Sequence, residues 1–154
     1  METLRTIVVP TDFSETSEGA LRAAVGMAKK YGAELVVLHV YAVPVYAFPD
    51  GAYIAPANLA AEISIAAQRG LDALEQRLLG EKVPMRFLLR EGNADEEIRA
   101  VAEEVRADLI VVGTHARRGL SRALLGSVAE TVIRTVDVPV LVVHPPHPPA
   151  SQAK

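Results

Sequence analysis

The sequence predicts a single α/β domain in which helices cover both faces of a five-stranded parallel sheet. Short runs of Val, Leu and Ile alternate with helical patterns along the 154 residues, and this alternation is typical of parallel strands joined by crossover helices. The runs are apolar almost without interruption, as expected for strands that are buried on both faces of a sheet. A chain of this length suits one domain and is short for two.

The strands of this sheet are predicted from four strong apolar runs and one weaker run. The strong runs are Thr6–Val9, Leu35–Val40, Leu109–Val112 and Val138–Val143, and the weaker run is Met85–Leu89. Between them lie four segments with the spacing of amphipathic helices.

The first two helices have recognisable ends. Ser14 or Thr16 can cap the first helix, because a hydroxyl oxygen accepts a hydrogen bond from a free N–H group of the first turn. Gly32 stands where a glycine in the left-handed conformation ends a helix. The second helix has apolar residues at steps of three or four over Leu59–Leu78, and Gly80 is expected to end it.

Two more helices follow. Asn93, with Glu96 three residues later, resembles a capping box. The acidic residues Asp95–Glu97 lie where the helix dipole favours negative charge. The last helix has its apolar residues within Val128–Val136.

Two segments lie outside the regular alternation. The segment Ala42–Ala57 holds three prolines and the aromatic residues Tyr46, Phe48 and Tyr53, so it is expected to be a long loop and a possible lid. The tail reads HPPHPPASQAK and is too polar and proline-rich to pack. We therefore expect a domain over residues 1–143 and a disordered tail over residues 144–154.

Composition excludes several classes of function. The formal net charge is −3, which disfavours a general nucleic-acid binder held by a basic surface. The chain has no cysteine, so disulfides and zinc–thiolate sites are excluded. It has no secretory leader pattern and no apolar stretch of about 18 residues. We expect a cytoplasmic protein that does not bind membranes.

Two segments are expected to meet where strand order reverses, which is where open α/β sheets bind ligands. Pro10–Ser14 follows the first strand, and Gly113–Ser127 follows the fourth. The second segment has three glycines and three arginines and no acidic residue, and its Gly126-Ser127 pair opens a helix, so it is suited to phosphate. Asp12 can accept hydrogen bonds from ribose hydroxyls or hold a metal ion.

Each of these features has a simpler interpretation. Asp12 could cap the first helix, and Gly126-Ser127 could be an ordinary helix start. The arginines could form a solvated face. No Ser–His–acid set has a spacing that indicates nucleophilic catalysis.

The sequence resembles the ATP-binding subgroup of the universal stress proteins over roughly residues 4–143. The resemblance rests on VVPTDFSETS, on a strand that ends in LHVY, and on VVGTHARRGLSRALLGSVAETVIR followed by VPVLVV. The family motif is Gly, two residues, Gly, nine residues, Gly, then Ser or Thr. Gly113, Gly126 and Ser127 match this motif, whereas Ala116 stands at the place of the middle glycine.

The resemblance implies the site and the ligand, which would be ATP with Mg²⁺. It implies that Asp12 contacts ribose or adenine, that Pro10 and Thr11 shape the base pocket, and that Val40 offers its backbone to adenine. The ribose and phosphates would be lined by Gly113, Ala116, Gly126, Ser127 and Val128, with Arg117 as a further candidate.

The resemblance also implies a sheet order of 3-2-1-4-5 and a stress-response regulatory role with an unidentified protein partner. It further implies a homodimer joined through the last strand, Val138–Val143. Two other functions stay open. One is slow ATP hydrolysis at the same site, and the other is a dimerising interaction module without nucleotide, which Ala116 favours.

Overall fold

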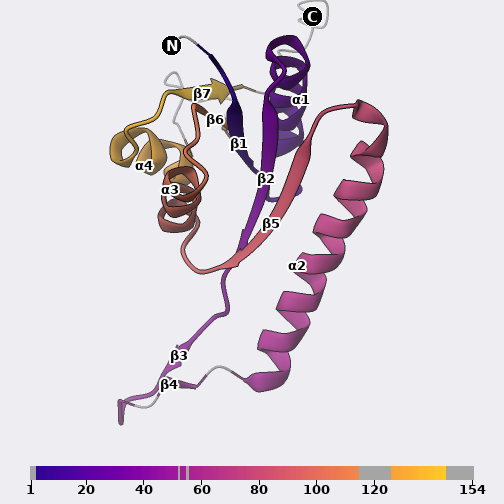
Figure 1. Cartoon of the computed structure of the whole chain (residues 1–154). Coiled ribbons are helices and arrows are strands. Elements are labelled where there is room, and N and C mark those ends of the chain that lie inside the picture. The colour runs from indigo at the N-terminus through magenta and orange to yellow at the C-terminus, as the bar shows by residue number, and fades with distance from the viewer. Residues whose placement is uncertain (1–2, 52, 55, 115–125, 145–154) are drawn as a thin grey trace, which may run out of the picture.

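A computed structural model describes residues 3–51, 53–54, 56–114 and 126–144. Its main sheet has five parallel strands in the order β5-β2-β1-β6-β7 (Figure 1). The strands are β1 (Thr6–Pro10), β2 (Glu34–Tyr41), β5 (Met85–Glu91), β6 (Leu109–Gly113) and β7 (Val140–Val143). Counted alone, these five strands have the order 3-2-1-4-5, which is the expected order.

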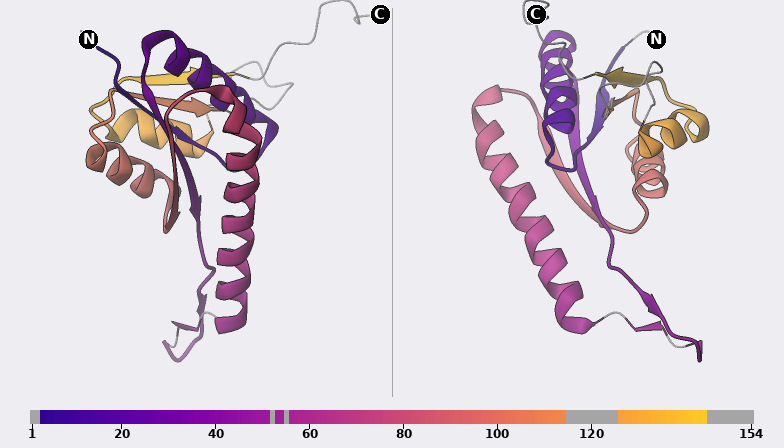
Figure 2. Two further views of the ribbon diagram at one scale, coloured as in Figure 1. Left: turned by 45° about the vertical axis from the view of Figure 1, so that its right-hand side comes forward. Right: turned by 180° about the vertical axis from the view of Figure 1, so that it is seen from behind.

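The helices form a layer on each side of this sheet, so the predicted fold class is confirmed (Figures 1 and 2). The helices are α1 (Glu15–Tyr31), α2 (Ala57–Leu78), α3 (Ala94–Glu104) and α4 (Ser127–Thr135). Helices α1 and α2 share one apolar core with the sheet, and α3 and α4 share the other.

Strand β1 shows why the apolar runs are continuous. Ile7 and Val9 are fully buried on the α1 and α2 side. Val8, between them, is fully buried on the α3 and α4 side. Successive strand residues point to opposite faces of a sheet, and here each face is covered by helices, so every position is apolar.

The ends of α1 confirm the predicted signals. Ser14 is the N-cap, and its side chain accepts a hydrogen bond from the N–H of Ser17 at 3.3 Å. At the other end Gly32 has a φ of 67°, and its N–H bonds to the carbonyl of Ala28. This left-handed conformation costs glycine little, because glycine has no Cβ.

Helix α2 has Leu78 as its last residue, as predicted, but Gly80 does not end it in the left-handed conformation. The backbone stays right-handed at Leu79 and continues into the 3-10 turn η1 (Leu79–Glu81). The left-handed residue that turns the chain is Lys82, with a φ of 53°. In α3, Asn93 occupies the N-cap position as predicted, but its side chain makes no capping hydrogen bond.

Strand β7 begins later than predicted, at Val140 instead of Val138. Pro139 has no N–H to give to a strand ladder, although its carbonyl accepts a hydrogen bond from the N–H of Ile110 at 3.0 Å. In the described sheet β7 lies at one edge, where Leu141 is 37% exposed.

The segment expected to be a long loop contains a short antiparallel pair, β3 (Tyr46–Ala47) and β4 (Tyr53–Ile54). This hairpin and the start of α2 project away from the body of the domain (Figures 1 and 2). Tyr46 and Phe48 on the hairpin are exposed. The predicted loop therefore contains secondary structure, because the backbone groups of β3 and β4 pair with each other instead of with the main sheet.

The predicted tail lies outside the described residues, apart from His144. Among the helices that the structure describes, none is long and apolar enough to cross a membrane.

Candidate functional site

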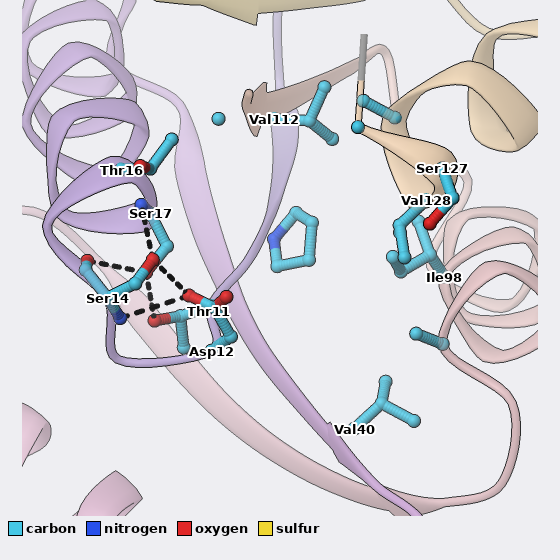
Figure 3. A pocket seen from close by; sticks show the side chains of 15 residues that line it. Thr11, Asp12, Ser14, Thr16, Ser17, Val40, Ile98, Val112, Ser127 and Val128 are labelled. Atoms are coloured by element: carbon cyan, nitrogen blue, oxygen red, sulfur yellow. Dashed lines mark hydrogen bonds between the residues drawn. The ribbon is translucent and has the colours of Figure 1, made fainter. Parts of the chain in front are cut away.

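A pocket of about 220 Å³ lies at the carboxyl ends of β1 and β6, where the strand order reverses. One wall is the turn after β1 with the start of α1, and the opposite wall is formed by the starts of α3 and α4 (Figure 3). Figure 3 shows Thr11 and Asp12 facing Ser127 and Val128 across the pocket.

Most of the residues predicted for the site line this one pocket. They are Pro10, Thr11, Asp12, Val40, Gly113, Gly126, Ser127 and Val128. The other two, Ala116 and Arg117, lie outside the described residues. Segments that are far apart in the sequence therefore meet as the strand-end argument predicted.

Sequence reasoning missed six of the fifteen described lining residues. They are Thr16, Ser17, Ala94, Ile98, Val112 and Ala129, whereas Ser14 lies within the predicted segment Pro10–Ser14. A signal existed for Ala94, because it stands at a predicted helix start beyond the carboxyl end of a strand. No comparable signal marks Ile98, whose place in the pocket depends on how α3 packs on the sheet.

The turn after β1 is held by its own polar groups. Thr11 is buried; its N–H donates to the carbonyl of Leu38 at 2.8 Å, and its Oγ1 accepts from the N–H of Phe13 at 3.0 Å. The Oδ1 of Asp12 accepts from the N–H of Ser14 at 3.0 Å and from its hydroxyl at 2.5 Å. The helix cap is thus Ser14, and Asp12 orients that cap while its side chain stays exposed at the pocket.

Gly113 is required by a close approach of α1 to β6. A Cβ at Gly113 would lie 2.5 Å from the carbonyl oxygen of Thr16 and 2.9 Å from its carbonyl carbon. Both atoms belong to the backbone, so neither can move aside as a side chain can. The missing side chain lets the first turn of α1 lie against the end of β6 and so brings two walls of the pocket together.

The start of α4 is suited to an anion. Gly126 is its N-cap residue and offers no side chain to bond the free N–H groups of the first turn. The one acidic residue of that turn is Glu130, whose Oε1 forms an ion pair with Nη1 of Arg134 at 3.5 Å. Helix α3, by contrast, has three acidic residues in its first turn. Of the two, α4 has the N-terminus whose dipole is available to a negatively charged ligand.

Thr114 places a buried hydroxyl group next to this site. It follows Gly113 and is only 1% exposed. Its Oγ1 has no hydrogen-bond partner among the described residues.

A second hollow adjoins the pocket and shares Val40 and Ala94 with it. Its other lining residues are Ala42, Val43, Glu91, Gly92 and Asn93. Neither hollow is lined by Tyr46 or Phe48, which are on the projecting hairpin. Ala42 and Val43, at the start of the same segment, do line the second hollow, so a lid role for Ala42–Ala57 stays a prediction.

Among its described residues, the lining of the pocket of about 220 Å³ has one ionisable side chain, the carboxylate of Asp12, and the adjoining hollow adds the carboxylate of Glu91. Within the described part of the chain there is no group of three or more His, Asp or Glu side chains that could hold a metal ion. The site thus combines a single carboxylate, hydroxyl groups, backbone N–H groups and apolar walls. Such a set can bind a polar ligand and fix its orientation.

Comparisons with known proteins identify the family of this chain. Residues 3–144 match the universal stress protein family. Universal stress protein MJ0531 of Methanocaldococcus jannaschii is 39% identical over 142 residues, which cover 91% of this chain and 82% of the relative.

Solved structures show the same architecture. UspA from Lactobacillus plantarum has a TM-score of 0.77 at 24% identity, over 93% of this chain and 99% of that chain, which is evidence for the fold alone. A universal stress protein solved in complex with cAMP has a TM-score of 0.67 at 26% identity, over 93% of this chain and 98% of that chain. Since the family match covers nearly all of the sequence and a relative aligns with it at 39% identity, the chain belongs to the universal stress protein family.

Proposed function

We propose that this protein binds ATP and acts as a nucleotide-dependent regulatory module of a stress response. The observation that carries the proposal is the start of α4, which has no side-chain cap and borders a pocket whose opposite wall holds Asp12. Phosphate is the ligand that such a helix start favours. The Asp12 carboxylate is an acceptor for ribose hydroxyls on the other side.

The two hollows suggest an orientation for the nucleotide. The first hollow, at about 220 Å³, is smaller than a typical pocket for a whole ligand. The ribose and phosphates would occupy it, and the adenine would pass Val40 into the adjoining hollow. The relative solved with cAMP supports an adenine nucleotide as the ligand class. Arg117 is proposed as a further phosphate contact because of its charge.

Mg²⁺ would come with the nucleotide. The described residues include no acidic or histidine cluster that could bind the ion alone. In nucleotide sites Mg²⁺ keeps several waters and is held partly by phosphate oxygens. In the pocket proposed for the ribose and phosphates, Asp12 is the one carboxylate of the described lining that could contribute a protein ligand.

The direct experiment is to denature the purified protein and identify what it releases. The proposal expects an adenine nucleotide, and chromatography against ATP, AMP and cAMP standards distinguishes the three. A preparation that releases no nucleotide and binds no added ATP at millimolar concentration would support the nucleotide-free interaction module instead. Phosphate release measured over hours with bound ATP tests the slow ATPase.

We also propose that the protein is a homodimer joined through β7. This strand lies at an edge of the described sheet, and an edge strand has unpaired backbone groups that need a partner. Pairing with the same strand of a second copy would satisfy them about a twofold axis. Leu141, which is 37% exposed, would then lie within the contact.

Replacing Leu141 by Lys is expected to weaken the dimer by about tenfold or more, which is about 1.4 kcal/mol. In a twofold contact each copy brings one new charge into the same apolar surface. Sedimentation velocity across micromolar concentrations measures the change. The matched control is Leu79→Lys, because Leu79 is 69% exposed and lies in the 3-10 turn after α2. A wild-type protein that sediments as a monomer at these concentrations would rule out the dimer.

A further inference from the structure

Phe13, in the turn beside the pocket, has an unusual backbone conformation. Its φ is 63°, in the left-handed region that a residue with a side chain rarely adopts. Such a conformation persists where the surrounding contacts hold it, and it is concentrated at functional sites. Phe13 directly follows Asp12, so whatever holds Phe13 also determines where Asp12 lies.

The contacts of the Phe13 ring explain the conformation. The ring lies against the imidazole of His39 in β2, with centroids 4.3 Å apart. It also lies on the backbone of α2 at Gly70, where a Cβ would come within 2.7 Å of its Cε2 and 2.9 Å of its Cζ. Gly70 therefore provides the space into which the ring fits, although the side chain of Phe13 is 43% exposed overall.

His39 connects the ring back to the turn. Its Nδ1 lies 2.7 Å from the carbonyl oxygen of Thr11, and because that oxygen can only accept, Nδ1 is the donor. The hydroxyl oxygen of Thr11 accepts in turn from the N–H of Phe13 at 3.0 Å. Asp12 is thus flanked in the sequence by Thr11 and Phe13, and both neighbours are held by contacts to residues that do not line the pocket.

Helix α2 is firmly placed where it meets the ring. On either side of Gly70, Ala67 and Leu71 are buried, as is Leu74 one turn further on. The same helix continues towards the projecting hairpin (Figures 1 and 2). A contact at Gly70 therefore joins the ligand-facing turn to an element that does not itself line the pocket.

We propose that Phe13 is a positioning residue: packed between Gly70 and His39, its ring holds the turn that presents Asp12 to the ligand and so couples ligand binding to α2. This inference rests on the proposed nucleotide function, of which it names a determinant of affinity. It concerns the ribose side of the site, since the turn faces α4 across the pocket (Figure 3).

The test is Gly70→Ala, with Gly26→Ala as matched control. Both glycines lie inside helices, so alanine raises helix propensity at each. A Cβ at Gly26 meets nothing within 4 Å, whereas a Cβ at Gly70 displaces the Phe13 ring. Gly70→Ala is expected to lower ATP affinity by about tenfold, the effect of losing one or two hydrogen bonds to the ligand. Gly26→Ala is expected to leave it unchanged.

Inorganic tripolyphosphate separates positioning from general damage. It can bind at the start of α4 without the ribose, so its affinity is expected to change by less than about twofold in Gly70→Ala. An equal loss of affinity for ATP and tripolyphosphate would mean that the substitution damages the whole domain, and would overturn the inference.

Phe13→Leu provides an independent variant, because leucine lacks the two ring atoms nearest to Gly70. Alone it is expected to weaken ATP binding several-fold and leave tripolyphosphate binding intact. Adding Gly70→Ala to it is expected to cause no further loss, since the clashing atoms are gone. Calorimetric titration measures the wild type, the three single variants and the double variant.

If the wild type binds ATP and both Gly70→Ala and Phe13→Leu bind it with unchanged affinity, the role of Phe13 is overturned and the proposed nucleotide function stands. A wild-type protein that does not bind ATP would overturn the proposed function and this inference with it.

Discussion

ATP at about 100 times its Kd is expected to raise the melting temperature of this protein by about 5–11 °C. A ligand that binds only the folded state at that excess adds roughly 2.7 kcal/mol to the free energy of unfolding. In a domain of this size each kcal/mol raises the melting temperature by roughly 2–4 °C. Adenosine is expected to give a smaller rise, because it has no phosphates to place at the start of α4. Thermal unfolding followed by circular dichroism measures both.

Gly126→Val is expected to abolish most of this rise. Gly126 has a φ of −59° and a ψ of 148°, which a residue with a side chain adopts without strain. The variant should therefore fold, and the effect of the branched side chain is to block the approach of phosphate to the first N–H groups of α4. An equal rise in the variant and the wild type would contradict the phosphate assignment.

Two further variants locate the rest of the ligand. Asp12→Ala removes the expected ribose acceptor, so it should reduce the rise. Ala116→Gly restores the glycine of the family motif and should preserve or increase it. No rise for the wild-type protein at millimolar ATP would contradict the proposed function as a whole.

The parts of the fold that were predictable depend on local patterns. Strands such as β1 and β2 are recognisable because burial on both faces makes their central positions apolar without interruption. The C-terminal end of α1 is recognisable because a single glycine, Gly32, has to be left-handed there. The residue that turns the chain after α2 was mispredicted because the left-handed residue is Lys82, whose side chain gives no such signal.

The candidate site was predictable to the extent that it follows from topology. The carboxyl ends of β1 and β6 had to be neighbours once the sheet was parallel and its order reversed there, so Asp12 and Gly126 could be expected to face one pocket. The contact of Phe13 with Gly70 could not be predicted, because it depends on how α2 packs over β2. The length of the segment Ala42–Ala57 suggested a lid, but sequence does not indicate in which direction its hairpin projects.

Gly113 matches the family motif, but the structure requires a glycine there because of a packing contact and not because of phosphate. The spacing of Gly113 to Gly126 suggested a contact with phosphate, and Gly113 does line the pocket. Its missing side chain, however, faces the backbone of Thr16, which a Cβ would meet at 2.5 Å. The glycine therefore sets the distance between α1 and β6, and the pocket lies beside that contact.

Gly113→Ala is accordingly expected to destabilise the protein by about 1–3 kcal/mol, the usual cost of inserting a methyl group into a packed contact. The melting temperature should fall by roughly 2–12 °C. Gly19→Ala is the matched control, because its Cβ would meet Val143 at 3.9 Å, an ordinary contact, and would add helix propensity in α1. Gly19→Ala should leave the melting temperature unchanged or raise it slightly.

The variant also separates the two roles of Gly113. If the glycine serves only to admit phosphate, Gly113→Ala keeps the stability of the ligand-free protein and loses the rise with ATP. If it serves the contact with Thr16, the ligand-free protein is destabilised, because α1 must move away from β6 before any ligand is present. We expect the second result, together with a smaller rise with ATP, since moving α1 also moves the turn that carries Asp12. A ligand-free Gly113→Ala protein that is as stable as the wild type would show that the two backbones can separate without cost, and the close approach would then have no structural importance.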